Sequence, residues 1–193
     1  FTSSDAGVSQ AFEAAPSGGG AWTKLSHTTI SADSAYVEFE PFSATYEDFK
    51  IVFVKFHPAT DSQELRMRYN IAGSEHTGSD YVCGVMGRSS NANTYYDDFN
   101  TENQFHLYTT NQPGNEADES GSLEVTITAV HNTTFFKHAY WIGVFATDTN
   151  QDIQPIMGGG NIQNTSAVTG CRFFFNSGNI QGGEATLYGR KIT

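Results

Sequence analysis

Basic residues are scarce in this sequence, and the scarcity restricts its possible partners. Lysine and arginine together number 10 among 193 residues, whereas aspartate and glutamate number 21, so the formal net charge is −11. Binding to phosphate groups requires clustered cations, and no block of basic residues occurs. We therefore expect neither nucleic acid nor an anionic membrane as a partner.

Long apolar runs and cysteine motifs are also lacking. The longest apolar run, residues 49–56, is interrupted by Lys50 and Lys55 and falls short of the ~18 residues that a membrane helix needs. Cys83 and Cys171 are the two cysteines, and neither belongs to a CxxC motif. Each lies in a strand-like apolar segment, which favours buried free thiols over a disulfide or a metal site.

Motifs for catalysis, metals and cofactors are missing as well. No G-x-S-x-G, P-loop, dinucleotide fingerprint or H-E-x-x-H spacing is present. Residues 148–152 have the D-x-N-x-D spacing of a calcium loop, but Ile153 and Gly159 occupy the positions that require Gly and Glu. We therefore predict no catalytic residue, no metal and no cofactor.

Glutamates remain as possible paired acids of a glycosidase, because two such residues can lie far apart in sequence. The strand-borne glutamates are Glu38, Glu40, Glu64 and Glu124, and each occupies an outward position of an alternating segment. That placement favours solvated faces over a pocket that raises a carboxyl pKa. A polysaccharide hydrolase is accordingly a remote alternative.

Alternating apolar and polar residues are what the sequence does contain, from Trp22 onward. Residues 64–71 are the clearest case, with Leu65, Met67 and Tyr69 on one face and polar residues on the other. Side chains alternate at period two in an extended strand. Roughly nine to eleven such segments and no capped helix predict one all-β domain over residues 22–193. We expect an antiparallel two-sheet sandwich of jelly-roll type.

Two segments, residues 49–56 and 139–145, are apolar on both faces. A lone sandwich buries only one face of each strand, so the second face needs cover from loops or from other subunits. This pattern predicts an oligomer.

The C-terminal residues 168–191 contain two apolar segments around a break. Cys171, Phe173 and Phe175 share one face of the first segment, and residues 176–179 are the turn formers Asn, Ser, Gly and Asn. The pattern predicts a closing pair of strands joined by a loop slightly longer than a tight hairpin.

Residues 1–21 differ in composition from the rest, since they are small and polar and include Pro16 and three consecutive glycines. One interpretation is a flexible tail. The other is an arm that orders only on a partner, with Val8 and Phe12 as its apolar anchors.

Residues 73–104 are rich in Gly, Ser, Asn, Asp and Tyr, and we interpret them as a long excursion with a possible strand at 81–86. Long loops are often functional, and Tyr with Asn suits adaptable binding, including binding to sugar rings. The alternative is an ordinary loop whose tyrosines pack on the sheet or on a neighbouring subunit. The candidate contact residues, for a glycan or a subunit, are Tyr81, Tyr95, Tyr96, Phe99, Asn91 and Asn93.

Four blocks in a fixed order resemble a family of virion proteins from tailed bacteriophages, especially aquatic ones. The blocks are FKIVFVKFHPATD at 49–61, LRMRYNIAGS at 65–74, GSLEVTITAVHNTTFFKHAYW at 121–141 and RFFFNSGNIQGGEATLYGRK at 172–191. The last contains the Ser-Gly-Asn-Ile and Leu-Tyr-Gly motifs of that family, at residues 177–180 and 187–189.

The resemblance implies a jelly-roll-like sandwich displayed on phage particles, as a tail-fibre end or as a head decoration or head-fibre protein. It implies a homotrimer, assembled in the host bacterial cytoplasm, with no catalytic motif. Our first hypothesis is therefore a non-enzymatic virion surface protein, attached to other virion proteins through residues 1–21. The second hypothesis is a glycan-binding module that recognises a host receptor.

Overall fold

The computed structural model describes residues 21–30, 33–90, 94–108, 113–116, 118–147 and 152–191. Thirteen β-strands and no helix lie in these segments, so the all-β prediction is confirmed, although the expected number of strands was too low. The described segments also contain no helix long and apolar enough to cross a membrane. The anchors predicted at Val8 and Phe12 fall outside the described residues.

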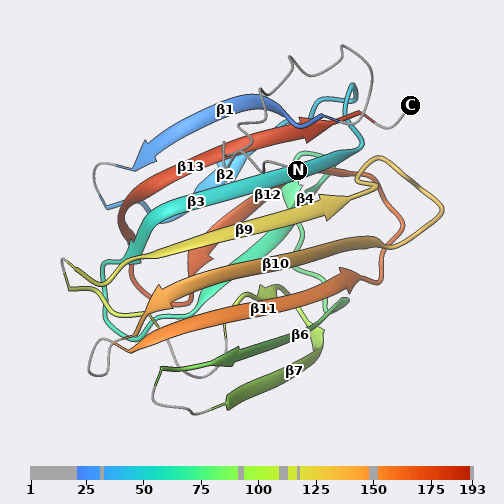
Figure 1. Cartoon of the computed structure of the whole chain (residues 1–193). Helices are drawn as coiled ribbons and strands as arrows, with labels where there is room; N and C mark the ends of the chain where they lie inside the picture. The colour runs from blue at the N-terminus through green and yellow to red at the C-terminus, as the bar shows by residue number, and fades with distance from the viewer. Residues whose placement is uncertain are drawn as a thin grey trace, which may run out of the picture.

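Eight antiparallel strands form the larger of two sheets (Figure 1). Strand β1 lies at one edge and β7 at the other, and sequence neighbours are often not sheet neighbours. In spatial order the strands are β1 (Thr23–Ile30), β13 (Ile180–Arg190), β3 (Asp48–Pro58), β9 (Gly121–Thr128), β10 (Lys137–Ala146), β11 (Ile153–Ile162), β6 (Tyr81–Arg88) and β7 (Thr94–Glu102).

The smaller sheet packs against the inner face of the larger one. Its strands are β2 (Val37–Phe39), β12 (Val168–Phe175), β4 (Leu65–Ile71) and β5 (Ser74–Glu75), and β8 (Phe105–His106) pairs with the start of β4. Two antiparallel sheets packed in this way form a sandwich, as the alternating sequence predicts.

Eight of the strands follow the jelly-roll order. Without β5, β6, β7, β10 and β11, the sheets read β1-β13-β3-β9 and β2-β12-β4-β8. The last two strands are inserted between the early ones, β13 between β1 and β3, and β12 between β2 and β4. This interleaving of late and early strands in two sheets identifies a jelly roll.

Two insertions lengthen the larger sheet beyond the jelly roll. The β10–β11 hairpin pairs with β9, and the β6–β7 hairpin then pairs with β11. We call these four strands the extension and the other four strands of the sheet the jelly-roll half. The strand expected at 81–86 is confirmed, but most of the predicted excursion at 73–104 is ordered sheet.

The closing strands differ from the expected pair. Strand β12 pairs with β2 and β4 in the smaller sheet, whereas β13 pairs with β1 and β3 in the larger one. The turn at 176–179 therefore crosses between the sheets rather than closing a hairpin. Alternation defines which face of a strand is buried, but it does not identify the neighbouring strand.

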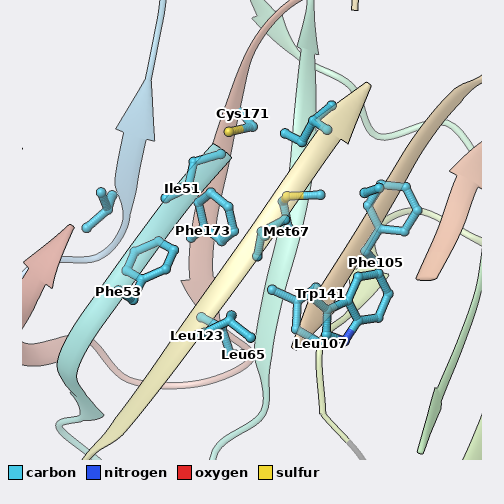
Figure 2. Packing of buried hydrophobic residues seen from close by; sticks show 14 of the residues in the cluster. Ile51, Phe53, Leu65, Met67, Phe105, Leu107, Leu123, Trp141, Cys171 and Phe173 are labelled. Carbon is cyan, nitrogen blue, oxygen red and sulfur yellow. The ribbon is translucent and has the colours of Figure 1, made fainter. Parts of the chain in front are cut away.

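The core lies between the two sheets (Figure 2). Phe53 of β3 meets Phe173 of β12 with ring centroids 4.8 Å apart, and both side chains are fully buried. Leu65 and Met67 are buried on the opposing sheet, as their alternation predicts. Burying large apolar side chains contributes roughly 1.5–3 kcal/mol each, so this layer is the main source of stability.

Cys83 and Cys171 are both free and buried, which confirms the prediction of unpaired thiols. Burial raises the pKa of Cys83 to about 11 and raises that of Cys171 as well. The thiols are therefore protonated and unreactive in the folded chain, because the thiolate is the nucleophilic form.

Candidate functional site

The outer face of the extension carries a group of exposed apolar side chains. We call this surface the extension face. Its members project from four neighbouring strands and are between 40% and 62% exposed: Met86, Tyr96, Tyr140, Ile142, Val144 and Met157. Large apolar side chains gathered on one surface, rather than scattered singly, are typical of binding sites.

Strand register explains why these side chains meet. Ile142 of β10 pairs with Met157 of β11, Met157 with Met86 of β6, and Met86 with Tyr96 of β7. Residues opposite one another in a sheet point to the same face, with Cβ atoms about 4.5–5.5 Å apart. The four residues therefore form one continuous apolar row across the extension.

A shallow groove of about 540 Å³ lies along this row. Gly84 and Gly159 pair with each other at outward positions next to the row, so no side chain fills the space between Tyr140 and the edge strand. A second groove of about 400 Å³ continues past Tyr96 toward Arg88. The glycines form the floor, and the aromatic and methionine side chains form the walls.

Polar groups on the extension face are few. The hydroxyl of Tyr96 donates a 2.7 Å hydrogen bond to Asp98, and this bond to a carboxylate raises the pKa of Tyr96. Recognition of sugars relies on several placed hydrogen-bonding groups, whereas burial of apolar surface needs none. The face is therefore better suited to an apolar protein surface than to a glycan.

The predicted contact residues do not gather into one site. Tyr96 lies on the extension face, whereas Tyr95, its neighbour in β7, is on the opposite face of the strand. Phe99 stacks on His106 with ring centroids 3.8 Å apart. Asn91 and Asn93 lie outside the described residues.

Tyr81 requires a correction, because its side chain is fully buried and cannot contact a partner. Its hydroxyl donates to the carbonyl of His76 at 3.0 Å and accepts from the Tyr69 amide at 3.1 Å. Burial raises the pKa of Tyr81, so the hydroxyl stays a donor. The alternation of Tyr81, Cys83 and Val85 in β6 was the sequence signal for this inward position.

Glu64 is a second correction, since it was expected on a solvated face and is buried. Its carboxylate is 2.6 Å from Nδ1 of His106 and accepts a 2.9 Å hydrogen bond from Arg66. Burial by itself would raise the pKa of Glu64, but the bonds to His106 and Arg66 outweigh it and lower the pKa. With Phe99 stacked on the imidazole, this cluster links β4, β7 and β8 and has a structural role.

The other strand-borne acids are paired with cations or amides. Glu38 accepts hydrogen bonds from Arg172 and Asn70, and Glu124 is 2.7 Å from Lys50. Among the described residues, no group of three His, Cys, Asp or Glu side chains has an arrangement suited to a metal ion. Residues 148–151 of the D-x-N-x-D segment at 148–152 are outside the described residues.

Sequence reasoning did not identify most of the extension face. Tyr140, Ile142 and Val144 belong to the segment that was noted as apolar on both faces, and that was the available signal. Met86 and Met157 carried no such signal, because their partners are set by long-range pairing. No protein-family model and no curated protein matches this sequence.

Proposed function

We propose that this chain is a non-enzymatic structural or attachment protein on the surface of a bacteriophage virion and that it acts as a homo-oligomer. The observation that carries the proposal is a jelly roll with an apolar outer sheet face that the described part of the chain leaves exposed. Jelly rolls are frequent among viral capsid domains, and an uncovered apolar face suits a subunit of an assembly.

The sequence resemblance supports the same role. All four resembling blocks contain jelly-roll strands: β3, β4, β9, and β12 with β13. The resemblance implies three copies per assembly, with residues 1–21 as an arm that binds other virion proteins. Head and tail locations are both consistent with these features.

Localisation in purified particles tests this proposal. Peptide mass spectrometry of gradient-purified virions is expected to detect the chain, and antibody labelling in electron microscopy is expected to mark the particle surface. The matched control is the same host processed without infection. Absence of the chain from purified virions would contradict the proposal.

A glycan-binding receptor module is the second candidate, and exposed Tyr96 on the outer face favours it. On a glycan array, the Tyr95→Ala, Tyr96→Ala double variant would lose binding if these residues formed the site. Unchanged binding in the variant would show that the glycan does not bind at this surface.

A further inference from the structure

We propose that the extension face is the surface through which copies of this chain bind one another. The inference deepens the proposed function, because it assigns the contact that the homo-oligomer needs. It follows from the area, the composition and the shape of the face.

The area of the face is in the range of a subunit interface. Its six residues are each 40–62% exposed, and the patch they form is comparable with the largest apolar patches on typical monomers, about 300–600 Å². A standard interface buries about 800 Å² on each partner. The six side chains therefore supply most of one side of such an interface, and the flanking residues supply the rest.

The composition of the face matches contacts between identical subunits. Tyrosine, methionine and aliphatic side chains are enriched in the centres of interfaces, and homodimer interfaces are more apolar than transient ones. The row from Ile142 to Tyr96 contains no charged residue. Charged residues lie beside the row: Glu124 pairs with Ile142 at one end and is bonded to Lys50, and Arg88 and Asp98 lie on either side of the other end, in β6 and β7.

The shape of the face offers both projecting side chains and a recess. Tyr140 and Met157 are exposed side chains beside the groove, and Gly84, which has no side chain, leaves its floor open on the same surface. Projecting side chains and a recess on one face allow every copy to supply both halves of the contact. A Cβ at Gly84 would lie 3.2 Å from the Asp98 carboxylate, so a side chain there would press on that group and shallow the groove.

Other occupants fit less well. Anionic membranes are disfavoured by the net charge of −11, and glycans by the scarcity of polar groups on the face. Pairing of two β7 edges is disfavoured because Asp97, Asp98 and Glu102 would bring like charges together. Contact with a second copy of the extension face would instead place one uncharged apolar row against another.

Light scattering during size-exclusion chromatography tests the proposal on the full chain. The parent is expected at two or more times the chain mass of 21.1 kDa, and the Ile142→Lys, Met157→Lys variant at the single-chain mass. The matched control is His27→Lys, Thr186→Lys, which adds the same charge to a directly paired position on the jelly-roll half. The control is expected to keep the parental mass.

Methionine oxidation of the unmodified parent provides a second test that needs no variant. Met86 and Met157 are about half exposed in a single chain, whereas Met67 is buried in every state. In the assembled protein, dilute peroxide is expected to oxidise Met86 and Met157 nearly as slowly as Met67. The three methionines are the whole set in this chain, so the comparison is internal.

Three results would overturn the inference. A parent with the mass of a single chain would mean that another protein, rather than a copy, covers the face. A lysine variant that keeps the parental mass, or rapid oxidation of Met86 and Met157 in an oligomer, would place the subunit contact elsewhere. A single-chain protein found in virions would refute this inference and the oligomeric part of the proposed function but leave the virion role intact. An oligomer absent from virions would refute only the virion role.

Discussion

The two halves of the large sheet have similar inner faces and different outer faces. Both bury apolar side chains against the core, such as Phe53 in the jelly-roll half and Trp141 in the extension. Outside, the jelly-roll half pairs polar groups, with Lys50 2.7 Å from Glu124 and His27 2.9 Å from Thr186. The extension instead presents an uncharged apolar row.

The change occurs between two adjacent strands, where Glu124 of β9 pairs with Ile142 of β10. Folding of the sandwich requires only the inner face to be apolar, so the outer face is free to match what it meets. The outer face of the jelly-roll half carries paired polar groups beside Val52 and Val54, whereas that of the extension carries the exposed apolar row. The comparison therefore separates residues that stabilise the fold from residues that we propose serve assembly.

The largest expected effect is a difference in stability between a substitution on the buried inner face of the large sheet and one on the extension face. Phe53→Ala is expected to lower the free energy of unfolding by about 3–5 kcal/mol, because it leaves a cavity beside Phe56 and Phe173. Ile142→Ala on the extension face is expected to change it by about 0.5 kcal/mol or less. Urea unfolding at a concentration that yields single chains measures both, and equal losses would contradict the division.

The next largest effect concerns the buried cluster in which Glu64 contacts His106 and Arg66. Glu64→Gln is expected to lower stability at pH 7 by about 3 kcal/mol, because it removes one partner of a buried ion pair. The matched control is Glu124→Gln, whose surface pair with Lys50 contributes about 1 kcal/mol or less. Urea unfolding of the three proteins measures the difference.

The contribution of Glu64 also depends on pH in a defined direction. Its pKa is lowered from 4.5 in the folded chain, so the unfolded chain binds a proton first as the pH falls. The stabilisation is therefore complete above about pH 4.5 and disappears as the pH falls through the folded pKa. A parent-to-variant difference that stayed constant down to pH 2 would show that the carboxylate charge is unimportant.

The smallest expected effect is a difference in local opening between β6 of the extension and β12 of the smaller sheet. Cys83 is 5% exposed in β6, between β11 and the edge strand β7, whereas Cys171 is fully buried in β12, between the edge strand β2 and β4. Less buried segments open more readily than fully buried ones, so a thiol reagent is expected to label Cys83 about tenfold faster under native conditions. Mass spectrometry of the labelled peptides measures the rates. Equal native rates would indicate that both thiols react only through global unfolding.

Local sequence patterns predicted the strand faces well and the strand partners poorly. Leu65 and Met67 are buried as expected because alternation is a property of a single strand. Tyr81 and Glu64 were expected at the surface and are buried, because a neighbouring element covers each one. The candidate site was recognised only in part, through the two apolar faces of residues 139–145.

The sequence alone determined an all-β sandwich with two buried free cysteines and a strand that is apolar on both sides. It did so because side-chain alternation and polarity act within a few neighbouring residues. Only the tertiary structure decided that β12 and β13 lie in different sheets and that four strands align Ile142, Met157, Met86 and Tyr96 in one row. That row joins residues far apart in the chain, and the free energy of packing the whole domain, rather than any local preference, selects their register.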